Sequence, residues 1–287
     1  MSPPTTAGPS LAAALGAALA IPLASTAVAG TPAGPTVDEP TVDGPPSSAW
    51  GLTAEATFAS KYMAHGYNFG GDDEPSFQPA LTLTTPLPWL TFAAWAGLPF
   101  DRDFDDHDEL DFLLKLGWTF NEGERMAVEV HGYLDYWLLP NRKEPHNGGR
   151  ERFTGGKFNF GFSLPELWRA GGVALVPGYN VFWWVPEHSG MFDNGAVHEF
   201  STAARWETAG PGADGQSVAW QALALAGYND GAFGSRPGWS HCIAGLSAAI
   251  PLGPLTVTPS LNYQWSFESS VNPEDDFWAA LTLSYTF

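Results

Sequence analysis

The chain has 287 residues, and its 31 acidic and 12 basic residues give a formal net charge of −19. This acidity argues against nucleic-acid binding, because neutralising phosphates needs clustered Lys and Arg, and the single cysteine excludes an intramolecular disulfide. Only 15% of the residues are charged while 14% are aromatic, a composition typical of a β-rich protein or of a surface that faces something other than water.

The first 29 residues are predicted to be a secretory signal peptide. Residues 11–24 form an apolar run that is too short to cross a bilayer as a helix, which needs about 20 apolar residues. An A-x-A cleavage pattern follows at Ala27–Ala29, although no Lys or Arg precedes the run. A disordered Ala-rich N-terminus is the alternative. Residues 30–48 are Pro-rich and predict a disordered linker, so the folded domain is expected over residues 49–287.

From Trp50 onward the dominant period is two, which predicts β-strands with one apolar and one polar face. The segment from Glu109 to Phe120 shows it most clearly, because every second residue from Leu110 to Phe120 is apolar. About twelve strands are predicted, at residues 50–62, 78–85, 88–98, 108–120, 124–139, 152–164, 170–184, 194–207, 216–229, 239–250, 254–267 and 276–287.

The connections between these strands alternate in length. Long connections at 63–77, 99–107, 140–151, 185–193, 230–238 and 268–275 interleave with shorter ones at 86–87, 121–123, 165–169, 208–215 and 251–253. Alternating lengths are typical of an antiparallel transmembrane β-barrel, which has short periplasmic turns and longer extracellular loops. The all-β alternative is a secreted, soluble β-sandwich.

Aromatic residues near the predicted strand ends favour the barrel. Trp and Tyr form girdles at both interfaces of membrane barrels, and the candidates are Trp89, Trp118, Trp137, Trp168, Trp183, Trp206, Trp239 and Trp278. The chain ends in alternating apolar residues, with Tyr285 and Phe287 as a predicted signal for the barrel assembly machinery. We therefore expect the Gram-negative outer membrane as the location, with its lipid and lipopolysaccharide as partners; the oligomeric state stays open.

The polar strand faces would line the lumen of such a barrel. The predicted lining residues are Glu109, Asp111, Lys115, Glu129, His131, Asp135, Lys157 and Arg205. Two interpretations remain open: a lumen packed with salt bridges, or a polar channel whose acidic excess favours cations. His131 could hold a metal ion with its carboxylate neighbours, but a structural histidine is the stronger interpretation, and no metal site or cofactor is predicted.

A second set of acidic residues falls in the predicted outer loops. It consists of Asp72, Asp73, Glu74, Asp101, Asp103, Asp105, Asp106, Asp108, Glu274, Asp275 and Asp276. Such carboxylates suit loosely bound Ca²⁺ or Mg²⁺, including ions that bridge to lipopolysaccharide phosphates. A solvated acidic surface is the simpler alternative, and cation concentration at a pore mouth is a third.

The sequence offers no catalytic motif. The strings around His188 and His198 lack the Asn-Gly of a phospholipase-type barrel, and there is no G-x-S-x-G, H-E-x-x-H or phosphate loop. No catalytic residue is therefore predicted, and a barrel-borne hydrolase is the least favoured of the functions.

Residues 50–140 carry short motifs in a familiar order. They are SKYMAHG at Ser60–Gly66, Pro75–Leu81, Trp95, Glu109–Asp111 with Gly117 and Trp118, and Tyr136 before Pro140. This stretch resembles the TorF-type porins of Gram-negative outer membranes, whose first strand ends in Ser-Asp-Tyr-x-x-Arg-Gly. Lys61 and His65 depart from that pattern. The resemblance implies a porin and names no solute.

Together these features predict a porin-like passive channel for small hydrophilic solutes, with a preference for cations. The alternative is a non-conducting structural or adhesive barrel whose acidic loops bind divalent cations. A loop folded into the lumen is compatible with either function.

Overall fold

A computed structural model describes residues 50–69, 74–100, 108–143, 152–186, 194–210 and 216–287, together with the paired two-residue strands β1 (Val28–Ala29) and β2 (Thr31–Pro32). Apart from β1 and β2, the predicted signal peptide and linker lie outside the described residues. In the ranges that are described, no helix is long and apolar enough to cross a membrane.

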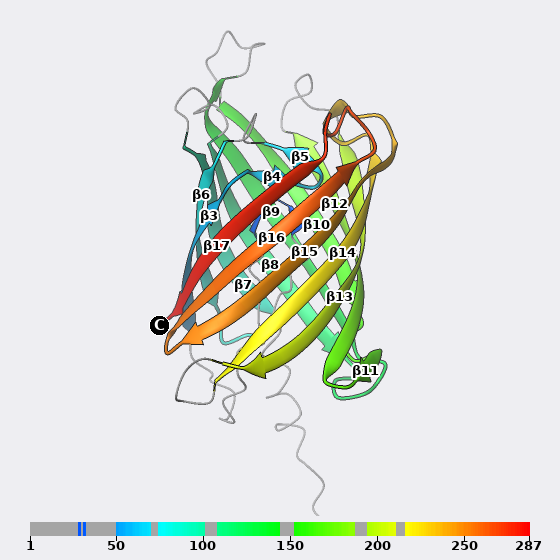
Figure 1. Cartoon of the computed structure of the whole chain (residues 1–287). Helices are drawn as coiled ribbons and strands as arrows, with labels where there is room; N and C mark the ends of the chain where they lie inside the picture. Colours follow the sequence, from blue (N-terminus) through cyan, green and yellow to red (C-terminus); the bar gives the residue numbers. More distant parts are fainter. Residues whose placement is uncertain are drawn as a thin grey trace, which may run out of the picture.

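Twelve antiparallel strands close into a barrel (Figure 1). Each strand pairs with the next along the chain, and the last pairs with the first through Ala280↔Ala59 to Thr286↔Thr53, so that the barrel has no free edge. The strands are β3 (Gly51–Ala59), β6 (Ser76–Thr84), β7 (Leu90–Pro99), β8 (Glu109–Phe120), β9 (Val128–Lys143), β10 (Arg152–Ser163), β12 (Val173–Pro186), β13 (Gly195–Ala209), β14 (Ser217–Asp230), β15 (Gly238–Leu252), β16 (Leu255–Ser266) and β17 (Asp276–Thr286).

The twelve predicted strands are confirmed, and closure shows that the β-sandwich alternative is wrong. The connections at the end of the barrel that carries the C-terminus are mostly the shorter ones, with only two residues between β15 and β16 (Figure 1). The connection from β10 to β12 departs from this sorting, because its nine residues include β11 (Trp168–Ala170), which pairs with the start of β12. The largest departure is in the fifth strand, predicted at 124–139 and observed as Val128–Lys143, and the first strand ends at Ala59, three residues before the predicted end.

The outer face of the barrel is apolar. Alternate residues of each strand point to opposite faces, and on β8 the outward set includes Phe112, Trp118 and Phe120, each more than half exposed. Leu134 and Tyr136 on β9 are similarly exposed. A soluble protein rarely shows so continuous an apolar surface, whereas a barrel in lipid requires it.

Two of the eight tryptophans expected in the girdles lie elsewhere. Trp137 and Trp278 are 5% and 7% exposed and pack inside the barrel, so the girdle prediction is wrong for both. The reason is strand parity. Trp137 shares the inward face of β9 with Asp135, and Trp278 shares the inward face of β17 with Ala280. Five of the others, Trp89, Trp118, Trp168, Trp183 and Trp239, are exposed.

Candidate functional site

A short piece of the chain lies inside the lumen near one end of the barrel. Residues 60–69, the inserted segment, follow β3 and contain two short paired strands, β4 (Met63–Ala64) and β5 (Tyr67–Asn68). They turn at His65 and Gly66, whose φ angles are 50° and 89°, in the left-handed region. Figure 1 shows β4 and β5 inside the barrel, toward the end opposite the C-terminus. The sequence predicted a long external loop here, and much of that loop instead occupies the lumen.

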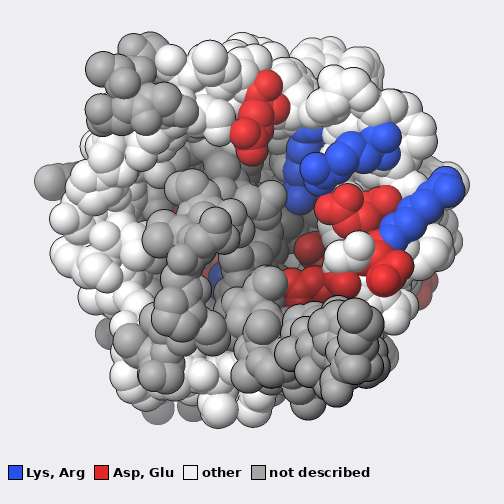
Figure 2. Space-filling model, turned by 90° about the horizontal axis from the view of Figure 1, so that it is seen from below, with Lys and Arg blue, Asp and Glu red and all other residues white. Residues whose placement is uncertain are grey.

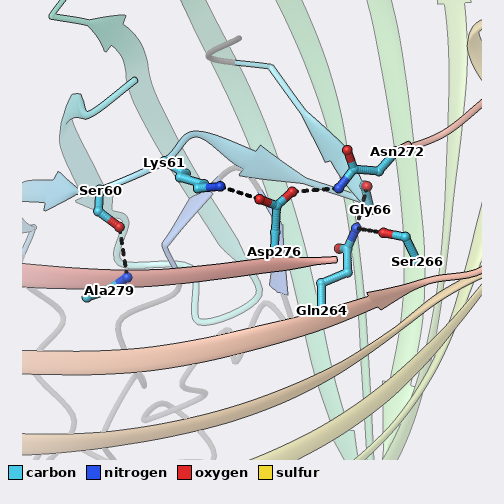
Figure 3. Close-up of polar contacts among 8 residues, drawn as sticks. All are labelled: Ser60, Lys61, Gly66, Gln264, Ser266, Asn272, Asp276 and Ala279. Atoms are coloured by element: carbon cyan, nitrogen blue, oxygen red, sulfur yellow. Dashed lines mark hydrogen bonds and ion pairs between the residues drawn. The ribbon is translucent and has the colours of Figure 1, made fainter. Parts of the chain in front are cut away.

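The inserted segment is tied to β17 and β16 by polar contacts (Figure 3). Asp276 is buried at the start of β17, where its carboxylate pairs with Lys61 and accepts a hydrogen bond from Asn272 Nδ2 at 2.6 Å. On β16, Gln264 Nε2 donates to the Gly66 carbonyl at 2.8 Å. The two ties hold the start of the segment and its turn against the same side of the wall.

The tip of the segment reaches the opposite wall. His65 Nδ1 lies 3.0 Å from Glu199 Oε1 on β13, and the two side chains are almost fully buried. The His65 ring packs on Phe182 and Trp184 of β12, with ring centroids 4.0 and 4.7 Å away. Contacts with strands on opposite sides of the barrel are available only to a segment inside it.

Tyrosine hydroxyls fix the flanks of the hairpin. Tyr62 donates to Glu109 Oε2 on β8 at 2.6 Å. Tyr67 donates to the carbonyl of Ala232 at 2.8 Å and accepts a hydrogen bond from Asn229 Nδ2 at 2.6 Å. Glu109, predicted to line the lumen, therefore has a partner that the sequence did not suggest.

Two further connections complete the closure. In the short 3₁₀ turn η3 (Ala232–Gly234), the Phe233 ring lies 5.1 Å from Tyr67, 5.7 Å from Phe69 and 5.0 Å from Trp184, between centroids. Phe233 adopts φ 56°, a left-handed conformation that costs a residue of this kind about 1 kcal/mol or more. The ring contacts hold this turn over the inserted segment.

The connection between β16 and β17 packs beside this turn. Ser235 Oγ donates to the Ser270 carbonyl at 3.0 Å, and Arg236 Nε lies 3.7 Å from Glu268 Oε1. The backbone N–H of Ser270 holds the pKa of Glu268 below its ordinary value, which keeps the carboxylate ionised beside Arg236. Three connections thus meet at one mouth of the barrel.

A charged cluster lies within the lumen on the wall formed by β8, β9 and β10. Lys157 Nζ is 2.9 Å from Asp135 Oδ2 and 3.3 Å from Asp111 Oδ2, and both aspartates are buried. Three neighbouring strands each contribute one residue through inward-facing positions. Lys115 lies on the same face of β8 as Glu109 and Asp111.

The other predicted lining residues contact polar side chains of other strands. Glu129 accepts from Ser163 Oγ at 2.9 Å, and Arg205 Nε donates to Gln221 Oε1 at 3.0 Å. His131 Nε2 lies 2.7 Å from Asn180 Oδ1. Over the described ranges no three His, Cys, Asp or Glu side chains are grouped to hold a metal ion. The neighbour of the His131 ring is therefore the Asn180 amide and not a metal-binding cluster.

The predicted acidic loops are only partly described. Asp72, Asp73, Asp101, Asp103, Asp105 and Asp106 lie outside the described residues. Asp108 accepts from Asn141 Nδ2 at 2.7 Å, Glu74 is half-buried, and Glu274 and Asp275 are exposed. Asp276 differs from the rest, because strand parity turns it inward to Lys61.

The opposite end of the barrel has a charged rim. Figure 2 shows this end, where acidic and basic side chains gather along one arc of the mouth. Arg169 of β11 pairs at 3.2 Å with Glu166, which lies in the turn before that strand, and Arg125 Nε donates to the Leu167 carbonyl at 3.4 Å. Exposed pairs of this kind contribute little to stability.

The predicted assembly signal lies at the same end of the barrel. Phe287, the last residue, is exposed, and its ring centroid lies 4.8 Å from that of Tyr285.

Sequence reasoning missed the residues that hold the inserted segment in place, notably Tyr62, His65, Tyr67 and Phe233. One available signal was composition, since residues 63–69, expected to begin a long loop, hold the aromatic residues Tyr67 and Phe69. Glu199, which the parity of its strand turns inward, gave no sign of a partner 134 positions away in the chain.

Neither a protein-family model nor a curated protein matches the chain, so membership of the TorF-type family stays a prediction. Among solved structures, the COG4313 outer membrane channel from Pseudomonas putida F1 is similar, with a TM-score of 0.50 at 14% identity over 83% of this chain and 95% of that one. LpxR from Salmonella typhimurium reaches a TM-score of 0.44 at 10% identity, over 82% of this chain and 100% of that one. At these identities the likeness shows the fold alone.

Proposed function

We propose that the protein is an outer-membrane channel of the porin kind, which passes small hydrophilic solutes passively and prefers cations. The observation that carries the proposal is the contrast between the two faces of one closed barrel. The outer face carries exposed rings such as Phe112 and Phe160, and the inner face carries charged and amide side chains. An apolar exterior suits lipid, and a polar interior suits water and solutes.

The cation preference rests on the charges inside. Inward-facing carboxylates include Glu109, Asp111, Glu129, Asp135, Glu199 and Asp276, while the basic residues facing them are Lys61, Lys115, Lys157 and Arg205. Rings of carboxylates in a narrow, low-dielectric passage lower the energy of cations relative to anions. Exposed acidic residues of the loops, such as Glu274 and Asp275, would raise the cation concentration at the mouth.

The remaining assignments belong to the same proposal. The end with the short connections would face the periplasm, and Tyr285 and Phe287 would be read by the barrel assembly machinery. Loop carboxylates would meet lipopolysaccharide through Ca²⁺ or Mg²⁺. We expect no enzymatic activity, since the sequence carries no catalytic motif.

A second candidate is a non-conducting structural or adhesive barrel. The observation in its favour is the closed mouth itself, in which Tyr62, His65 and Tyr67 are buried and hydrogen-bonded. Under this alternative the inserted segment would be a permanent filling of the lumen, comparable to the packed interior of a small barrel.

Single-channel recording in planar lipid bilayers separates the two candidates. For the refolded protein in a KCl gradient we expect discrete current steps. The reversal potential should have the same sign as the equilibrium potential of K⁺. Anion selectivity would overturn the cation preference. Absence of steps, both in the native protein and in a variant with the inserted segment removed, would overturn the channel and favour the structural barrel.

A further inference from the structure

We propose that the inserted segment, residues 60–69, is a gate that leaves the lumen as a unit and so switches the channel between closed and open states. The inference rests on the proposed channel function and adds its regulation. It is carried by how the segment is attached, by what surrounds its tip and by where the strain lies.

The barrel needs only the first residue of the inserted segment for its own hydrogen bonding. β3 pairs directly with β6 from Gly51↔Thr84 to Ala59↔Ser76, and with β17 on its other side, where Ser60 N donates to the Ala279 carbonyl at 2.9 Å and Ser60 Oγ accepts from Ala279 N at 3.0 Å. The rest of the segment pairs mainly with itself, through β4 and β5 and the bond from Phe69 N to the Tyr62 carbonyl at 2.8 Å. Withdrawal that pivots at Ser60 would therefore break no rung of the ladder between spanning strands.

Beyond Ser60, the ties to the wall are chiefly side-chain contacts that water can replace. They are the Lys61–Asp276 ion pair, the Tyr62–Glu109, His65–Glu199 and Gln264–Gly66 hydrogen bonds, and the contacts of Tyr67 with residues 229–235. A hydrogen bond exchanged for water changes the free energy by only about 1 kcal/mol. The closed state is consequently held by several weak hydrogen bonds and by one stronger tie, the buried Lys61–Asp276 pair.

Polar atoms of the wall around the tip of the segment would gain hydrogen bonds if water entered. Among the described residues, Glu199 Oε2, His241 Nε2 and Gln264 Oε1 are buried and have no hydrogen-bond partner. Each belongs to a side chain that touches or faces His65 or Gly66. A buried polar atom without a partner costs about 1–3 kcal/mol, and entry of water on withdrawal would recover part of that cost.

Backbone strain in the closed state also favours withdrawal of the segment. His65 in the turn of the segment and Phe233 above it both have left-handed φ angles, 50° and 56°. Such conformations persist only where the surroundings enforce them, and they cluster in elements that switch. Withdrawal would remove the ring contacts of Phe233 with Tyr67 and Phe69 and let both backbones relax.

A reversible thiol lock tests the gate in the full chain. In a Cys242→Ala background, which removes a thiol on the lipid side of β15, Gly66→Cys is combined with His241→Cys. A Cβ built on Gly66 lies 2.9 Å from His241 Cγ, so the two thiols would meet. A second pair, His65→Cys with Glu199→Cys, is joined by a short bis-methanethiosulfonate reagent, which forms a reducible disulfide with each cysteine and replaces the length lost from the native side chains, whose polar atoms are 3.0 Å apart. Each single-cysteine variant is the matched control.

With either lock closed we expect the open probability to fall about tenfold or more, equal to roughly 1.4 kcal/mol, and to recover on reduction. Gel mobility verifies that the link has formed. Equal conductance before and after reduction, with the link verified, would overturn the gate while the channel remains. Absence of current in the native, the reduced and the segment-deleted proteins would overturn the channel itself.

Discussion

Gly66 and His241 occupy adjoining parts of one space inside the barrel, so that a Cβ atom on Gly66 would lie 2.7 Å from the His241 ring at Cε1. Glycine is required at position 66 for two reasons: a Cβ atom would clash with this ring, and the φ angle of +89° is one that residues with a Cβ atom rarely adopt. Gly227, which pairs with His241 across β14 and β15, leaves room on the other side of the same ring. One buried imidazole therefore sets how closely the inserted segment can approach the wall.

Gly66→Ala should loosen the inserted segment without unfolding the barrel, because it adds both a steric clash and backbone strain. We expect longer and more frequent openings in bilayer recordings, with unchanged heat-modifiable migration on gels. Gly253→Ala is the matched control, since its φ of +66° is strained but its Cβ would meet nothing within 4 Å. Similar recordings for the two variants would contradict the role given to His241.

Reversing the charge of Lys61 should release the first arm of the segment. Lys61→Glu places a carboxylate against the buried Asp276, and breaking a buried pair costs about 3–5 kcal/mol. Combining Lys61→Glu with Asp276→Lys restores opposite charges and should return the open probability toward the native value. Additive effects of the two changes, measured as a double-mutant cycle, would show that the pair does not hold the segment.

Lys157 should limit the cation selectivity of the lumen, since it neutralises part of the charge of Asp111 and Asp135. Lys157→Met should shift the reversal potential from the native value toward the equilibrium potential of K⁺. Asp135→Asn, which removes a negative charge, should shift it in the opposite direction. Arg169→Met removes the same charge from an exposed turn and is the control. A shift of equal size in that control would assign selectivity to net charge instead of to the lumen.

The lipid-facing surface can be tested with two neighbours on β16. Leu261 is 51% exposed on the outer face, whereas Ser260 points inward. An arginine on the lipid face near the bilayer midplane costs about 2–4 kcal/mol. Leu261→Arg should therefore lower the free energy of unfolding from lipid vesicles by more than Ser260→Arg does. The reverse order, measured by urea titration, would contradict the assigned faces.

The strands were predictable because lipid and lumen impose a period of two on every one of them. The same rule locates residues that chemistry alone misplaces. Trp137 and Trp278 suit a girdle and Asp276 suits a loop, yet parity with Asp135 and Ala280 turns all three inward. For these residues, position along the strand outweighs side-chain type.

The closure of the lumen was not predictable from periodicity. The inserted segment is too short for a repeat, and its partners Glu199, Asn229 and Asp276 lie far along the chain. Their pairing depends on which inward positions of the closed barrel come to the same depth. That depth is set by the register of the strands, a property of the assembled barrel and not of any one segment.

The most direct test of the account is a single-channel recording of a variant in which residues 60–69 are deleted and β3 is joined to β6 through the rest of the connection. We predict a higher open probability than in the native protein, with steps at least as large and cation selectivity retained, because the wall keeps Glu109, Asp111 and Asp135 when the lumen is cleared. A correctly folded variant with a native or lower open probability would contradict the claim that this segment closes a conducting lumen.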